Sequence, residues 1–283
     1  MIKKIHSIVL VSIVLLTSGM LKSQYVLDGA YVPEHIKERK VVPYPSLRQA
    51  DVMWEKRIWQ ILDMREKLNH PLYYPVEQLA NRKSLFDVIR YGLSEEKSIT
   101  AYSTGPLGQD DEFKTPLMVN EVEAMFSNID TSMTEDLETG EFKQVIQQID
   151  IESSDIKQFK LKESWLFDRQ RSERYVRIIG IAPRQEVKGE DGEIRGTKDM
   201  FWLYFPECRY LFANWDVFNR NNDAERRSFD DVFMKRMFSS YVVRESSPSN
   251  RDISEYTSGI DHLLESERIK QDLMELEHDL WSY

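Results

Sequence analysis

The chain has 283 residues, with 38 Lys and Arg residues against 48 Asp and Glu residues, and a formal net charge of −10. This length is enough to bury a core without disulfides, and the single cysteine, Cys208, has no partner for an intrachain disulfide. The acidic balance argues against nucleic-acid binding, because phosphate backbones repel a negatively charged protein.

The first 23 residues have the pattern of a signal peptide. Lys3 and Lys4 precede a mostly apolar run from Ile5 to Leu16, which is too short to span a membrane comfortably. We expect residues 1–23 to be removed, which leaves Gln24 as the new N-terminus; an uncleaved anchor or a buried helix is the alternative. No cysteine here could carry a lipid, and no later apolar run is long enough to insert in a membrane, so any attachment must come through a partner.

Residues 24–46 are predicted to form an extended arm. They contain Pro33, Pro43 and Pro45 and show little periodicity, and proline favours extended conformations for itself and for the preceding residue. Such an arm either lies over its own domain or reaches a neighbouring chain.

Residues 47–69 show the spacing of an amphipathic helix. Trp54, Ile58 and Ile61 recur at intervals of three and four residues, Ser46 is a suitable N-cap, and Pro71 follows the end. The pattern predicts the first helix of the fold.

The next 80 residues carry weaker signals. Ser84 and Asp87 have the spacing of a capping box and predict a short helix, and residues 99–103 are rich in strand-forming types. Residues 103–116 are predicted to be a loop. Amphipathic segments near 119–126 and 142–149 flank an acidic stretch at 130–141.

Three predicted strands form an antiparallel meander. Residues 156–167 alternate between apolar and polar side chains, which is typical of a half-buried strand. After a polar turn at 168–172, residues 175–182 are apolar on both faces and end at Pro183, which predicts a central strand. A turn at 190–193 leads to an apolar strand at 200–205, which Pro206 is expected to end.

Three arginines, Arg169, Arg171 and Arg174, lie in or near the first of these turns, next to Asp168 and Glu173. Charged turn residues usually contact water. The alternatives are ion pairs across an interface, where the planar guanidinium is favoured, or an anion-binding catalytic role. We take the three arginines as candidate contacts with a partner.

The C-terminal quarter is predicted to be helical. Ser228 and Asp231 cap a helix that is expected to run to about Ser240, and residues 245–250 resemble a small hinge. The last 25 residues predict one acidic helix, which has an apolar stripe made of Ile269, Leu273, Leu276 and Leu280, and which Ile260, Leu263 and Leu264 extend upstream.

The apolar stripe must be buried against some surface. That surface is either its own domain or another chain, and the hinge favours docking away from the chain's own core. The four residues of the stripe are therefore candidate partner contacts as well.

These elements predict an α+β fold, with an antiparallel meander sheet packed against several helices. We expect four parts: a signal peptide at 1–23, an extended arm at 24–46, an α+β domain at 47–245, and a hinge with an acidic helix at 246–283.

Catalytic and metal-binding patterns are missing from the sequence. The four histidines beyond the leader lack metal-ligand spacing, and there is no glycine-rich phosphate loop or nucleophile motif. Cys208 is expected to be a small core residue. Glu163 and Asp168 could serve a glycosidase, but such a pair is expected by chance among 48 acidic residues. We expect no enzyme activity and no cofactor.

Aromatic residues and arginine occur together in several segments, which is the composition of interface anchors, although core packing explains the same pattern. Six stretches together resemble the GldN/PorN family of gliding-motility and type IX secretion proteins of Bacteroidetes. They lie in the same order along nearly the whole chain, at residues 44–75, 84–92, 175–183, 201–209, 223–243 and 259–281.

The resemblance implies a periplasmic protein without catalytic activity. Such proteins assemble with an outer-membrane lipoprotein, GldK/PorK, and with copies of themselves into a large ring beneath the outer membrane, and the ring is thought to contact the periplasmic part of the motor protein GldM/PorM. The family has no catalytic residues to transfer to this sequence. A periplasmic hydrolase and a carrier of a small apolar ligand are the alternative functions.

The leader gives a direct test. N-terminal sequencing of the protein from envelope fractions is expected to begin near Gln24, because the apolar run and the small residues after it direct export and cleavage. An intact Met1 in those fractions would contradict the prediction.

Overall fold

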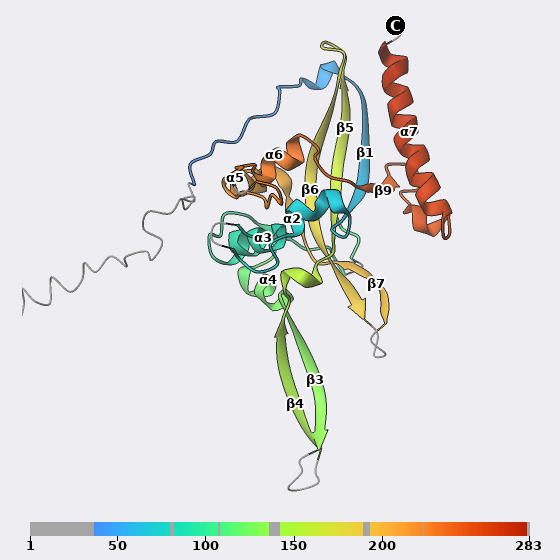
Figure 1. The fold of residues 1–283 in the computed structure, drawn as a ribbon. Coiled ribbons are helices and arrows are strands. Elements are labelled where there is room, and N and C mark those ends of the chain that lie inside the picture. The colour runs from blue at the N-terminus through green and yellow to red at the C-terminus, as the bar shows by residue number, and fades with distance from the viewer. Residues whose placement is uncertain are drawn as a thin grey trace, which may run out of the picture. The chain divides into compact units, whose positions relative to one another are not determined.

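The computed structural model describes residues 37–79, 82–106, 108–135, 142–188, 193–222 and 224–281. Their fold is α+β, as predicted: a seven-stranded antiparallel sheet carries helices, and a separate two-stranded hairpin extends from it (Figure 1). The sheet order is β2-β8-β6-β5-β1-β9, with β7 paired to β6.

The sheet strands are β1 (Val52–Asp63), β2 (Ala101–Tyr102), β5 (Gln158–Asp168), β6 (Glu173–Lys188), β7 (Ile194–Asp199), β8 (Trp202–Tyr204) and β9 (Tyr241–Glu245), and the hairpin consists of β3 (Ser127–Glu135) and β4 (Phe142–Asp150). The helices are α2 (His70–Tyr73), α3 (Leu85–Ser94), α4 (Val119–Met125), α5 (Phe205–Asn214), α6 (Phe229–Met234) and α7 (Asp261–Trp281), with single 3₁₀ turns η2 (Gln49–Asp51), η3 (Lys67–Asn69), η4 (Ser153–Asp155) and η5 (Ile253–Glu255).

The helix predicted at 47–69 is wrong, because most of this segment is the strand β1. Its first half alternates, with Met53, Glu55 and Arg57 exposed and the residues between them half-buried. Its second half lies between β5 and β9, so side chains on both faces are buried. A central strand therefore carries apolar residues on both faces in place of a period of two, and here the positions of Ile58, Ile61 and Leu62 coincided with helical spacing.

The meander is confirmed at its centre, where β5 pairs with β6 and β6 pairs with β8. Pro183 does not end the second strand: it lies inside β6, opposite Phe159, where β6 changes its partner from β8 to β7. The strand β7 was not predicted. Pro206 also does more than end a strand, because it occupies the first turn of α5, where its missing N–H is not needed.

Both predicted helix caps are confirmed. The hydroxyl of Ser84 accepts a hydrogen bond from the amide of Asp87, and Ser228 accepts one from Asp231. The helix that follows Ser228 ends at Met234, earlier than the predicted Ser240, because the chain turns there and enters β9.

Smaller expectations were met in part. The strand expected at 99–103 is only the two residues of β2, and residues 142–149 belong to the strand β4. Residues 1–23, most of the arm, the end of the acidic stretch at 136–141 and the turn at 190–192 lie outside the described residues.

One face of the sheet carries the main core, under α3, α5 and α6. Leu62, Phe159, Leu161 and Ile181 of the sheet contact this core. Phenylalanines of the two later helices meet there, with ring centroids 5.4 to 5.8 Å apart, in the set Phe205, Phe212 and Phe233. This cluster fixes α5 and α6 to the sheet.

The loop of residues 103–116 covers the opposite face. Phe113, which has a positive φ of 56°, packs between Tyr102 and Trp202 at centroid distances of 5.6 and 6.1 Å. A Cβ atom at Gly180 would lie 2.5 Å from the Phe113 ring, so β6 needs glycine at this point. The predicted loop is therefore ordered as a cover for the sheet.

Helix α7 packs against its own sheet, beside β9 (Figure 1). Ile269 and Leu273 are buried with Ile58, Val242 and Ile253. The expectation that the stripe docks away from its own domain is therefore wrong for Ile269 and Leu273. The segment read as a hinge is also held, because the amide of Ser246 donates to the carbonyl of Arg57 at 2.8 Å.

Among the described residues, no helix is both long enough and apolar enough to cross a membrane.

The two sides of α7 predict different mutational effects. Leu273→Asp is expected to lower the free energy of unfolding by about 3–5 kcal/mol, because a side chain that is 5 % exposed would be replaced by a buried charge. Leu264→Asp on the same helix is the matched control. Leu264 is 62 % exposed, so its change should stay within about 0.5 kcal/mol in thermal or urea unfolding. Equal melting of both variants would contradict the packing of α7.

Candidate functional site

The two carboxylates considered for a hydrolase do not form a site. Glu163 is fully buried and accepts hydrogen bonds from Gln60, Trp165 and Arg236 at 2.8 to 3.0 Å. Asp168 is also buried and accepts the amide of Gln170 at 2.8 Å, which shapes the β5–β6 turn. They are five positions apart on one strand, so their side chains point to opposite faces of the sheet. Neither can reach a substrate together with the other.

Asp111 is the polar centre of the loop that covers the sheet. Its carboxylate accepts hydrogen bonds from the indole of Trp59 at 2.6 Å, from Lys162 at 3.1 Å and from Arg244 at 2.7 Å. The ammonium of Lys162 also donates to the Asp111 carbonyl at 2.7 Å. The guanidinium of Arg244 lies 3.9 Å from the ring centroid of Trp59. One carboxylate therefore pairs with the buried Lys162 and the partly buried Arg244, and ties the loop to β1, β5 and β9.

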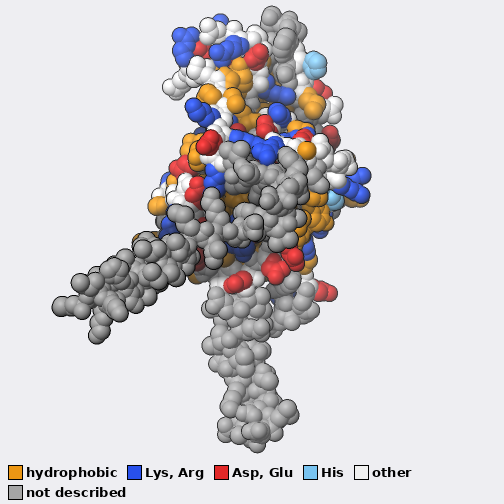
Figure 2. Space-filling model, turned by 60° about the vertical axis from the view of Figure 1, so that its left-hand side comes forward, with side chains coloured by type: hydrophobic (Ala, Val, Ile, Leu, Met, Phe, Trp, Pro, Cys, Tyr) orange, Lys and Arg blue, Asp and Glu red, His pale blue; other side chains and the backbone are white. Residues whose placement is uncertain are grey.

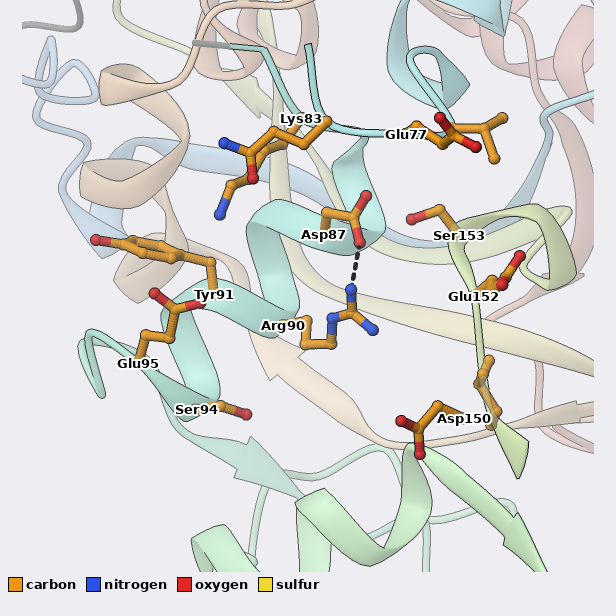
Figure 3. Close-up of a pocket in the computed structure, with 13 residues that line it drawn as sticks. Glu77, Lys83, Asp87, Arg90, Tyr91, Ser94, Glu95, Asp150, Glu152 and Ser153 are labelled. Atoms are coloured by element: carbon orange, nitrogen blue, oxygen red, sulfur yellow. Dashed lines mark hydrogen bonds and ion pairs between the residues drawn. The ribbon is translucent and has the colours of Figure 1, made fainter. Parts of the chain in front are cut away.

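A polar groove of about 630 Å³ lies beside α3 (Figure 3). Arg90 and Asp87 form an ion pair at 3.0 Å on one wall, and Glu152 and Ser153 face them from the other. Its acidic lining consists of Glu77, Asp87, Glu95, Asp150 and Glu152, against the bases Lys83 and Arg90.

Both cations of this groove already have partners in the chain, since Arg90 pairs with Asp87 and Lys83 lies over aromatic rings. The ammonium of Lys83 lies 4.4 Å from the ring centroid of Tyr91 and 5.0 Å from that of Trp215. Within the described part of the chain, no group of three or more His, Cys, Asp or Glu residues could hold a metal ion. The groove offers an acidic surface and no arrangement for catalysis.

The three predicted interface arginines lie apart and have different surroundings. Arg174 stacks on Trp165, with 4.9 Å between the guanidinium and the ring centroid. Arg171 is exposed, and its guanidinium donates to the carbonyl of Ser46 at 3.3 Å. Arg169 is exposed, and its amide donates to the carbonyl of Asp51 at 2.9 Å. Figure 2 shows a group of Lys and Arg side chains at the upper left of the molecule.

Arginines also hold the end of the arm on its own domain. Arg177 donates to the carbonyl of Pro45 at 2.8 Å, and Arg209 donates to that of Val42 at 2.8 Å. Arg209 is itself buried, forms an ion pair with Asp230 at 2.9 Å, and lies 4.5 Å from the ring centroid of Tyr44. Of the two paths considered for the arm, residues 37–46 follow the one over their own domain.

The apolar stripe of α7 is divided between burial and exposure. Ile269 and Leu273 lie in the core, while Leu276 is half-buried and lines a groove with Trp54 of β1. Leu280 belongs to α7, but its side chain lies outside the described residues.

The upstream residues of the stripe are exposed. Ile260, Leu263 and Leu264 have relative exposures of 75 %, 60 % and 62 %. We call these three residues the α7 patch. They are visible in the sequence as part of a helical repeat, but the sequence does not show that they face away from the core.

A second groove, of about 760 Å³, lies between the segment from Lys67 to Tyr74 and the segment from Val217 to Arg227. We call it the α2 groove. The rings of Tyr74 and Phe218 lie 6.5 Å apart along it. Its charged lining is mainly basic, with Lys67, Arg220 and Arg227 against Glu225, which pairs with Arg227. This groove could not be predicted from the sequence, because its two walls lie far apart in the chain.

Cys208 is fully buried in the main core. Burial raises the pKa of its thiol, which stays protonated and unreactive at neutral pH. The thiol is a packing group, as the sequence predicts.

Residues 47–282 match the family model described as "Gliding motility associated protein GldN". Among curated proteins, none matches the chain significantly. The match covers every sheet strand and helix of the described fold.

The Asp111 contacts lead to a stability prediction. Asp111→Ala is expected to lower the free energy of unfolding by about 3–5 kcal/mol, because the buried Lys162 would lose its counter-charge and Arg244 would keep only its longer contact with Asp252 at 3.6 Å. Glu112→Ala next to it is the control. The Glu112 side chain is exposed in its pair with Lys114, so its removal should change little in thermal unfolding. Similar melting temperatures for the two variants would show that the carboxylate does not hold the loop.

Proposed function

Because the chain belongs to the GldN family of gliding-motility associated proteins, we propose that it is a non-catalytic structural subunit of the type IX secretion and gliding machinery. In this role it forms a periplasmic ring with an outer-membrane lipoprotein of the GldK/PorK type and contacts the periplasmic region of the motor protein GldM/PorM. The observation that carries the proposal is the family match over residues 47–282, which spans the whole described sheet.

The described surface supports a role in binding other proteins. The α7 patch exposes three large aliphatic side chains together, and such patches on a folded chain mark interaction sites. Arginines and aromatic rings, which are enriched at interface centres, line the α2 groove and the β5–β6 turn.

The proposed location is the periplasm, at the inner face of the outer membrane. The basic and apolar leader supports export, and the lipoprotein partner supplies the attachment. In a strain without that lipoprotein, the protein should be recovered in the soluble periplasmic fraction.

The alternatives have less support. A hydrolase that used Glu163 and Asp168 would need them at one open site, whereas both are buried on opposite faces of β5. A carrier of an apolar ligand would need a cavity with an apolar lining, whereas the groove beside α3 is lined mainly by charged and polar side chains.

A pull-down tests the proposal. The tagged protein, purified from its own envelope after mild detergent extraction, is expected to carry a lipoprotein in stoichiometric amount. An exported protein with the same tag is the control for non-specific capture. Recovery of the chain with no envelope protein, or with a bound small molecule only, would reject the ring role and favour the carrier.

A further inference from the structure

The α7 patch faces away from the chain's own core. Ile260 precedes the buried Ile269 by nine residues, which is two and a half helical turns, so the two lie on opposite sides of the helix axis. Leu263 and Leu264 share the side of Ile260, and Met274, which is 60 % exposed, continues it two to three turns later. The patch therefore projects outward from a helix that its other face fixes to the sheet.

Acidic side chains accompany the patch. Asp261, Glu265 and Glu267 belong to the first two turns of α7, and Glu265 is drawn to one side by its ion pair with Arg268 at 2.7 Å. A surface that covers the patch must be apolar at its centre, and a basic rim would add electrostatic attraction to the acidic side chains.

The α2 groove has these two properties. Tyr74 and Phe218 supply apolar surface, and Tyr74 is 41 % exposed. Lys67 and Arg220 are exposed basic side chains that line the same groove. Its volume of about 760 Å³ falls in the range of ~300–1,000 Å³ that is typical of binding pockets. A convex apolar helix with acidic neighbours thus has a concave, aromatic and basic counterpart on the same chain.

We infer that the α7 patch of one copy binds the α2 groove of a second copy. The inference rests on the proposed function, since it supplies the self-contact of a ring. Within one copy the contact is not made, because the patch is exposed and Ile269 and Leu273 hold α7 beside β9. A symmetric contact between two patches would bring the acidic residues of two α7 helices together, and a contact between two grooves would bring basic residues together.

The contact is therefore heterologous: each copy uses its patch toward one neighbour and its groove toward the other. A heterologous contact leaves a free patch at one end and a free groove at the other, so it adds further copies and forms a ring where the rotation between neighbours closes.

Two variants test the two surfaces of the contact one at a time. The patch variant is Leu263→Asp with Leu264→Asp, and the groove variant is Lys67→Glu with Arg220→Glu. All four residues are exposed, so both variants should melt like the wild type. A third variant, Arg48→Glu with Lys114→Glu, reverses two equally exposed charges elsewhere and serves as the control.

Sedimentation of the purified proteins over a range of concentrations is the measurement. The wild type and the control should form multimers that grow with concentration, and each of the two variants alone should associate at least tenfold more weakly. Mixed in equal amounts, the patch variant and the groove variant should form a one-to-one dimer and nothing larger, because each keeps the half that the other lacks.

Three results would overturn the inference: a wild type that stays monomeric, variants that still form multimers, or a mixture that does not form the dimer. The lipoprotein pull-down distinguishes this failure from failure of the proposed function. If the patch variant no longer forms multimers but still captures the lipoprotein, the substitutions affect only the contact between copies of the chain.

Discussion

Coverage of both faces of the β1–β5–β6 ribbon is the constraint on which the rest of the fold depends. These strands are long, and β5, the second half of β1 and the centre of β6 are buried, so both faces need a cover there. Helices α5 and α6 cover one face with phenylalanines, and a loop without regular structure covers the other. The loop can cover this face because Asp111 accepts hydrogen bonds from three donors of the sheet and Phe113 fills the space that Gly180 leaves. A polar anchor thus fixes an irregular segment against an apolar surface.

The sequence predicted those parts of the fold whose signals are local. The strand β5 and the helix caps at Ser84 and Ser228 depend on neighbouring residues, and the structure contains all three. The half-buried character predicted for β5 is wrong, because Lys162 and Ser164 on its polar face are buried as well. The strand β1 was missed because its pattern is set by two flanking strands from distant parts of the chain. The prediction that Pro183 ends its strand was wrong for a similar reason, since a proline is tolerated inside a strand where the neighbouring strand changes.

The candidate surfaces also differ in how much of them can be predicted from local sequence. The helical repeat of α7 could be read directly, but which of its apolar residues face the core depends on Ile58 and Val242 of the sheet. The α2 groove could not be predicted, because tertiary folding alone brings residue 67 near residue 220. The clustered arginines were visible, but their surroundings were not: one stacks on a tryptophan and another bonds to the backbone of the arm.

Three of the contacts that hold the arm on its own domain are made with backbone carbonyls of the arm. Arg171, Arg177 and Arg209 bond to the carbonyls of Ser46, Pro45 and Val42, and every amino acid provides that carbonyl. Two side chains of the arm also contribute, because Arg39 forms an ion pair with Asp216 at 2.6 Å and the ring of Tyr44 lies beside Arg209. The three carbonyl contacts themselves do not depend on which side chains the arm carries, so the arm can change its outer side chains and keep this part of its path.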